Sequence, residues 1–164
     1  MNNFITVKSI VDENFQDYKK SSMFIALPKC DFKCFRELGL DPSGCQNFET
    51  LKLKNFKISI ESVFERYIGN PITKSIVLGG LEPFCSFDEI FSLISYFRNK
   101  QCFDDFVIYS GYYPDEIQDK IEFLKQFKNI IVKFGRFVPN SNSKFDNLMG
   151  ISLASENQFS MKIS

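Results

Sequence analysis

The chain of 164 residues contains no histidine. Without an imidazole it has neither a Ser-His nor a Cys-His catalytic pair, and it lacks the nitrogen ligand that many zinc sites need. Lysine plus arginine equals aspartate plus glutamate at 20 each, so the formal net charge is zero. A balanced charge removes the bulk electrostatic basis for binding nucleic acid or an anionic membrane. We therefore expect neither kind of partner.

The sequence also lacks an apolar run long enough to span a membrane, and its N-terminal segment carries Asp12, Glu13 and Asp17 instead of an apolar leader core. We therefore expect a cytoplasmic location. In a reducing compartment, an odd number of cysteines, five here, argues against a disulfide framework. Metal or redox chemistry is the better interpretation of these cysteines.

Apolar residues make up 44% of the chain and include 20 phenylalanines, which is ample for a packed interior. A chain of this length forms one core, so we expect a single domain over residues 1–164.

Short apolar runs alternate with amphipathic segments along the chain. Ser59 is placed to cap one helix, and Ser86 and Glu89 are spaced as a capping box for another. The alternation predicts an α/β fold with a mainly parallel sheet and right-handed crossovers. We expect strands at 22–27, 75–78, 106–109 and 129–134, helices at 59–68, 90–97 and 115–127, an edge strand within 4–11 and a last strand near 159–163.

Several residues with chemical potential follow the ends of the predicted strands. Cys30, the pair Gly79-Gly80 and the pair Ser110-Gly111 all occupy such positions. In parallel α/β folds, ligands bind at the carboxyl ends of the strands. The sequence therefore predicts a site at that edge of the sheet.

Three cysteines come from one segment that follows the first strong strand. Three residues separate Cys30 from Cys34, and ten more separate Cys34 from Cys45. Structural zinc needs four ligands, whereas a 4Fe-4S cluster held by three thiolates leaves one iron open to another ligand. Cys85 and Cys102 adjoin apolar helical segments, and we interpret them as small buried side chains.

The cysteine triad, followed by Gly79-Gly80-Leu81-Glu82-Pro83, resembles the radical S-adenosylmethionine (radical SAM) superfamily and its GGEP motif, with one residue inserted. The resemblance implies an open, partial TIM-barrel-like sheet that binds a 4Fe-4S cluster, with SAM on the open iron. It implies that Gly79, Gly80 and Pro83 shape the SAM site and that Glu82 lies near the ammonium group of SAM.

Three further segments resemble the anaerobic ribonucleotide reductase activating proteins: IYSGY at 108–112, FGRF at 134–137 and SLASENQ at 152–158. The resemblance implies cleavage of SAM to a 5'-deoxyadenosyl radical that generates a glycyl radical on a large reductase subunit. Flavodoxin or ferredoxin is the implied electron donor. Ser110 is then a ligand of SAM or a turn-stabilising serine, and Arg136 contacts the SAM carboxylate or the partner or lies in a surface loop. Asn157 lies near the nucleoside or the partner groove, or in a polar turn.

The spacing departs from the usual family pattern, in which the third cysteine lies three positions after the second. Here Cys45 lies eleven positions after Cys34, although Cys45-Gln46-Asn47 resembles short activating proteins with a stretched gap. Gly44 replaces the aromatic residue that usually touches adenine, which leaves Phe32 and Phe35 as candidates. Two other functions stay open: a radical SAM enzyme acting on a small molecule or peptide, and a non-catalytic zinc or iron-sulfur module.

Overall fold

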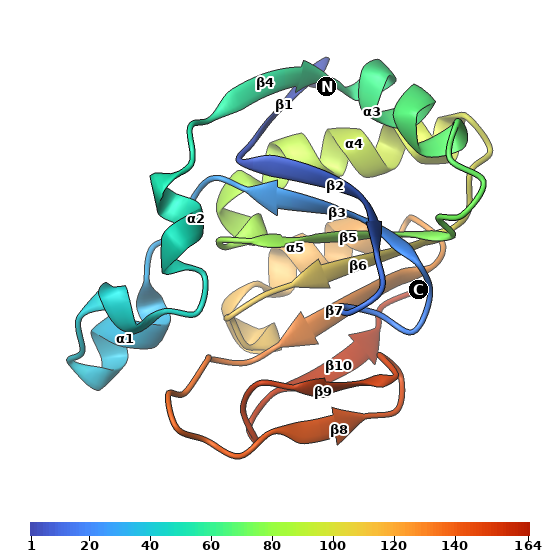
Figure 1. Ribbon diagram of the computed structural model, residues 1–164. Coiled ribbons are helices and arrows are strands. Elements are labelled where there is room, and N and C mark those ends of the chain that lie inside the picture. Colours follow the sequence, from blue (N-terminus) through green and yellow to red (C-terminus); the bar gives the residue numbers. More distant parts are fainter.

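A computed structural model describes all residues, 1–164, and is built around one six-stranded sheet (Figure 1). The strand order is β10-β7-β6-β5-β3-β2. The four inner strands pair in parallel, and the strand at each edge is antiparallel to its neighbour. The strands are β2 (Ser9–Asn14), β3 (Ser22–Leu27), β5 (Ser75–Gly80), β6 (Asp105–Tyr109), β7 (Ile130–Phe134) and β10 (Phe159–Lys162). The prediction of an α/β fold with a mainly parallel sheet is confirmed, and the sheet does not close into a barrel.

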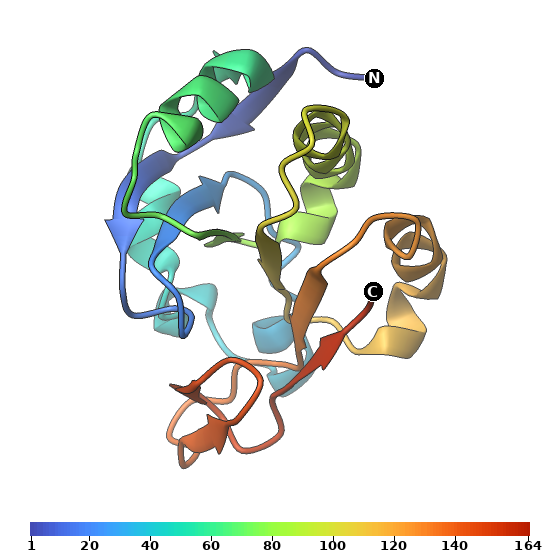
Figure 2. The same cartoon turned by 90° about the vertical axis from the view of Figure 1, so that its right-hand side faces the viewer.

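Three helices pack against one face of this sheet (Figure 2). They are α3 (Ile60–Ile68), α4 (Phe87–Asn99) and α5 (Gln118–Leu124). Each carries an apolar stripe, as an amphipathic helix over a sheet must. Between helices and sheet lies the main core of 24 buried residues. None of the helices is both long and apolar enough to cross a membrane.

Strand alternation divides the core into two layers. In β5, Ile76 and Leu78 face the helices, whereas Val77 between them faces the other side, as the period of two requires. The second side holds only six buried apolar residues. Tyr18 and the hairpin segment with Met149 and Leu153 cover it. Because both faces of the inner strands are buried, their sequences are apolar runs without polar alternation.

Smaller elements lie around the sheet. β1 (Phe4–Val7) pairs with β4 (Phe56–Ser59), so the strand expected within 4–11 is divided between two sheets. A hairpin joins β8 (Lys144–Asp146) and β9 (Ile151–Leu153). The cysteine segment contains α1 (Lys33–Leu38), the 3₁₀ turn η1 (Pro42–Gly44) and α2 (Phe48–Lys52), and the turns η2 (Pro83–Ser86) and η3 (Pro114–Glu116) precede α4 and α5.

The predicted cap of α3 is confirmed, because Ser59 Oγ accepts a hydrogen bond from the Ser62 amide at 3.0 Å. The capping box at α4 is wrong. Ser86 ends η2 with a backbone that is not extended, and its hydroxyl has no hydrogen-bond partner. Glu89 instead accepts hydrogen bonds from the amide and hydroxyl of Thr6. The helix expected at 115–127 is shorter, because η3 takes its first turn.

We predict that Phe97→Ala lowers the free energy of unfolding by about 3–5 kcal/mol, because a fully buried ring leaves a cavity in the core. The Phe97 ring packs edge-on against Phe64 and Phe106 at centroid distances of 5.0 and 5.2 Å. Phe123→Ala is the matched control, since that ring is 57% exposed, and it should cost less than about 1 kcal/mol. Urea denaturation measures both. Equal losses in the two variants would contradict the assigned core.

Candidate functional site

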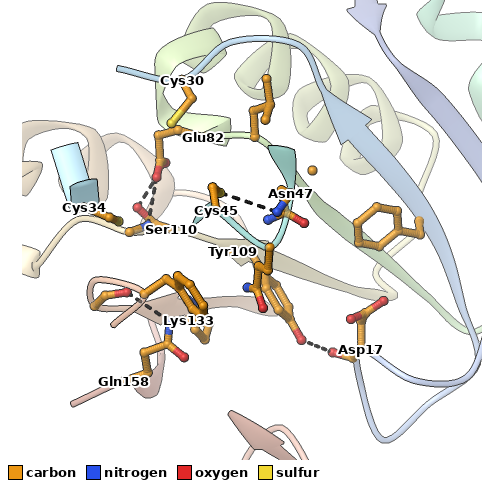
Figure 3. Close-up of a pocket in the computed structure, with 17 residues that line it drawn as sticks. Asp17, Cys30, Cys34, Cys45, Asn47, Glu82, Tyr109, Ser110, Lys133 and Gln158 are labelled. Carbon is orange, nitrogen blue, oxygen red and sulfur yellow. Dashed lines mark hydrogen bonds between the residues drawn. The ribbon is translucent and has the colours of Figure 1, made fainter. Parts of the chain in front are cut away.

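A cavity of about 260 Å³ opens at the carboxyl ends of the parallel strands (Figure 3). It lies at the edge of the sheet where the sequence placed a site. The cysteine segment forms one wall, and the ends of β5, β6 and β7 form the floor. Among its lining residues are Cys30, Cys34, Cys45, Gly80, Glu82, Ser110, Gly111, Lys133 and Gln158.

All three cysteines of the predicted triad line this cavity with free, partly exposed thiols. Cys30 follows β3 and its Sγ accepts the Phe32 amide at 3.2 Å. Cys34 lies in α1. Cys45 follows η1 and its Sγ accepts the Asn47 amide at 3.4 Å. The segment thus brings together thiols that the long sequence gap separates.

Local turns return the chain to the cavity after α1. Phe32 starts α1 and Gly39 ends it, both in the left-handed backbone conformation. Asp41 then accepts the Ser43 amide at 2.8 Å, and Pro42 occupies the first position of η1. Together these turns reverse the chain and place Cys45 on the lining of the same cavity as the first two cysteines.

Burial raises the pKa of the Cys30 thiol to about 12, against the smaller opposing effect of the Phe32 amide. Burial likewise raises the pKa of Cys34, while the Phe137 amide lowers it. Both groups are therefore protonated at neutral pH in the metal-free chain. Iron binds the thiolate, so loading the site releases protons.

The donor arrangement suits a cluster better than a single ion. No three cysteine, aspartate or glutamate side chains gather around one point. A zinc ion needs four ligands within about 2.3 Å of its centre. In a 4Fe-4S cluster each thiolate binds a different iron, so the ligands stand farther apart, around a group of eight iron and sulfide atoms rather than around one ion. Three thiols on the wall of one cavity fit that requirement.

Glu82 ties the ends of β5 and β6 together beneath the cavity. Its carboxylate accepts the Gly111 amide at 2.8 Å and the Ser110 hydroxyl and Phe84 amide at 3.0 Å. Burial raises its pKa to about 7, against the opposing effect of these hydrogen bonds. Two carboxylate oxygens offer about four acceptor sites, so three internal bonds leave capacity for one further donor.

Two glycines allow close approach at the cavity floor. Gly80 has φ +80°, and a Cβ there would lie 2.8 Å from Ala26 Cα on the neighbouring strand. A Cβ at Gly111 would lie 2.9 Å from Cys34 Sγ. A side chain at either position would displace the strand ends or the cysteine helix.

The sequence analysis missed Lys133, whose ammonium lies at the cavity. The residue is only 7% exposed, and its side chain makes no hydrogen bond or ion pair. Its Nζ lies 5.6 Å from the centre of the Tyr109 ring. Burial lowers its pKa to about 8, against attraction to Glu82 and Cys34. A lysine within the apolar run of β7 was the signal that could have found it.

Other predicted site residues lie outside the cavity lining: Gly79, Pro83, Arg136 and Asn157. A Cβ at Gly79 would meet the Phe24 ring, and Pro83 is buried at the start of η2. Asn157 donates to the Tyr113 hydroxyl and the Arg136 carbonyl. The rings of Phe24, Tyr109 and Phe137 line the cavity, whereas Phe32 and Phe35 do not.

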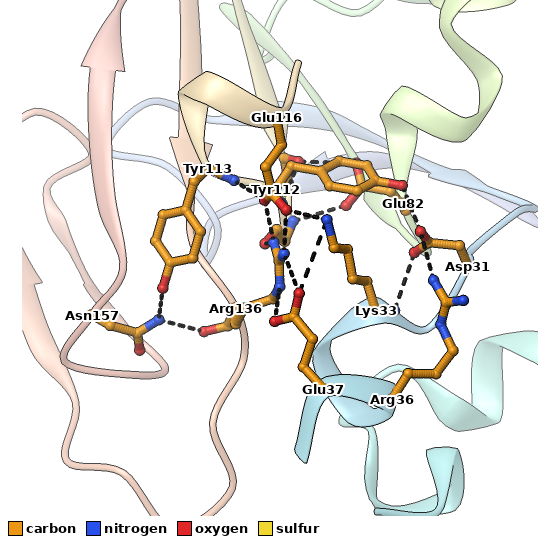
Figure 4. Close-up of polar contacts among 12 residues, drawn as sticks. Asp31, Lys33, Arg36, Glu37, Glu82, Tyr112, Tyr113, Glu116, Arg136 and Asn157 are labelled. Atoms are coloured by element: carbon orange, nitrogen blue, oxygen red, sulfur yellow. Dashed lines mark hydrogen bonds and ion pairs between the residues drawn. The ribbon is translucent and has the colours of Figure 1, made fainter. Parts of the chain in front are cut away.

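Arg136 joins a group of charged side chains beside the cavity (Figure 4). Its guanidinium contacts both carboxylate oxygens of Glu116 at 2.6 and 2.7 Å. Glu116 also accepts Lys33 and the Tyr113 amide. The Arg136 hydrogen bond is the main cause that lowers the pKa of Glu116 to about 2.

The sequence profile of a family described as "4Fe-4S single cluster domain" matches residues 21–158. The matched region contains the three cysteines and every residue named above as lining the cavity. A search of curated proteins found no match.

The lowered pKa of Glu116 predicts a stability change in acid. The folded chain holds this carboxylate ionised, so its contribution is present above about pH 4.5 and is lost as the pH falls toward about 2. Urea denaturation of the cluster-free chain between pH 5 and about 2.5 measures the loss. Glu116→Gln should flatten this part of the profile, whereas Glu122→Gln, at an exposed pair on α5, should not. An unchanged profile in Glu116→Gln would contradict the assignment.

Proposed function

Because the chain belongs to the family of 4Fe-4S single cluster domains, we propose that it is a radical SAM enzyme whose cluster is held by Cys30, Cys34 and Cys45. The observation that carries the proposal is the convergence of three free thiols and an unpaired ammonium on one cavity. Three thiolates leave one iron for an exchangeable ligand. When bound, the cluster supplies one electron to the SAM sulfonium, giving methionine and a 5'-deoxyadenosyl radical that takes a hydrogen atom from the substrate.

The cavity offers complementary groups for the amino acid part of SAM. The Lys133 ammonium faces the cavity without a partner, so an anionic carboxylate there gains a charge-assisted hydrogen bond. Glu82 retains acceptor capacity for an ammonium group on the same floor. Ser110 already donates to Glu82 and accepts the Tyr112 amide, so its main role is to hold that floor.

The adenine of SAM fits the aromatic part of the lining. Phe24, Tyr109 and Phe137 line the cavity, and an adenine can stack on such rings. Gly44, which stands where related proteins carry an aromatic residue, lies against the Phe35 ring, since a Cβ there would be 3.1 Å from it. Phe35 is therefore occupied in holding the turn.

We further propose that the substrate is a glycine of a large anaerobic ribonucleotide reductase subunit. The support is the resemblance of the segments 108–112, 134–137 and 152–158 to reductase activating proteins. The cavity also adjoins a second hollow of about 170 Å³, and Asp17, Gln46, Tyr109, Lys133 and Gln158 line both. We propose that a segment of the partner enters the site through that hollow. A flavodoxin or ferredoxin is the proposed electron donor.

Anaerobic reconstitution tests the cluster. We expect about four irons and four sulfides per chain, and formation of methionine and 5'-deoxyadenosine from SAM with dithionite. Cys30→Ala, Cys34→Ala and Cys45→Ala should each abolish SAM cleavage. Cys102→Ala should not, because this thiol packs against the main core and does not line the cavity. One zinc per chain and no SAM cleavage would support the non-catalytic module instead.

The same reconstituted protein tests the substrate. With a large reductase subunit present, electron paramagnetic resonance should detect a glycyl radical that depends on SAM. SAM cleavage without a glycyl radical would contradict the reductase as substrate and favour a small molecule or peptide.

Lys133→Met should weaken SAM binding about tenfold or more while iron content is retained, because a charge-assisted hydrogen bond is lost. Lys125→Met, at an exposed pair on α5, is the control. A SAM titration, followed through the electron paramagnetic resonance spectrum of the reduced cluster, measures the affinity for SAM. Native affinity in Lys133→Met would remove Lys133 from the SAM site.

A further inference from the structure

The helix that carries Cys34 makes little contact with the sheet. α1 has six residues, and only Phe35 among them is buried. A helix of this length is not stable alone, because the few backbone hydrogen bonds of one or two turns do not offset the conformational entropy lost in forming the first turn. Side-chain contacts made by the rest of the chain must therefore fix the position of α1.

Glu116 holds Lys33 at the start of α1, and two consecutive residues that follow β7 contact the rest of the helix. The Phe137 ring lies 6.2 Å from the Phe35 ring, centroid to centroid. Arg136 Nε and Nη2 each donate at 2.9 Å to an oxygen of Glu37 (Figure 4). These two contacts thus reach α1 at positions one and three residues beyond Cys34.

Arg136 is itself held firmly. Its side chain is 8% exposed, and its guanidinium also binds both oxygens of Glu116 and the Gly111 carbonyl. The planar guanidinium suits two bidentate carboxylates, which a lysine could not replace. All its nitrogens are occupied and the residue does not line the cavity, so it is not free to bind a SAM carboxylate.

The backbone after β6 also confines Cys34. Gly111 lies behind its sulfur, closely enough that a Cβ would sit at 2.9 Å. The Gly111 amide is bound by Glu82 and its carbonyl by Arg136. The sulfur therefore meets a backbone that is fixed from both directions.

We propose that Arg136 and Phe137 form a latch that positions Cys34 for cluster binding, through the Arg136–Glu37 pair and the packing of the Phe137 ring against Phe35. The inference rests on the proposed function, since it takes Cys34 as a cluster ligand. Arg136 is a positioning residue, because it acts through Glu37 and does not touch the cluster site.

The latch is tested first in the full-length, cluster-free chain. Arg136→Gln and Glu37→Gln should each raise the rate at which iodoacetamide alkylates Cys34 by about tenfold, read by peptide mass spectrometry against Cys102. Arg66→Gln is the matched control, because Arg66 forms an exposed bidentate pair with Asp12 on α3. Arg136→Lys should rescue the rate only in part.

The reconstituted enzyme supplies the second measurement. Arg136→Gln and Glu37→Gln should both bind less iron than the native protein. The electron paramagnetic resonance spectrum of their reduced cluster should also differ from the native spectrum. A native Cys34 alkylation rate and native spectrum in both variants would overturn the latch, and so would a lower melting temperature as their only change. Failure of the native chain to bind four irons would instead overturn the proposed function, which the alkylation result does not depend on.

Discussion

Parallel pairing of β3, β5, β6 and β7 is the constraint on which the site depends. Each of these strands must end at the same edge of the sheet, so segments distant in the sequence meet there. Glu82 after β5, Ser110 and Gly111 after β6, and Lys133 near the end of β7 become neighbours for this reason alone. The cysteine segment follows β3 and joins them. No single loop builds the cavity, and the buried Glu82 carboxylate keeps two of its strand ends in register.

The sequence was informative wherever burial alone determined structure. The inner strands are apolar on both faces, so runs such as Ser75 to Leu78 identified them. The helix cap at Ser59 depends only on the residues of its own turn, so the local sequence was enough to predict it. Ser86 also precedes an amphipathic helix, but it ends the turn η2. Its backbone is therefore not extended, and its hydroxyl does not accept an amide of the first turn of α4. Local patterns therefore predicted elements well and their ends less well.

The arrangement around the cysteines was beyond local patterns. α1 exists through contacts with Arg136, which lies 99 positions from Glu37, and no periodicity reports such a pair. Arg136 carried the expectation of a surface loop or a ligand contact and is instead buried among carboxylates. Lys133 differs, since a charge within a buried strand is visible in the sequence and costs free energy unless a ligand or partner compensates it.

The cysteine segment makes few buried contacts with the rest of the chain, and this affects how oxidation of the cluster would act on the fold. Iron-sulfur clusters are sensitive to oxidation. If the cluster ligands belonged to the main core, loss of the cluster would disrupt the packing of the fold. Here the thiols lie outside the 24-residue core, and of α1 only Phe35 is buried. Loss of the cluster would therefore remove none of the side chains that form this core, and the packing beneath the cavity does not depend on the metal.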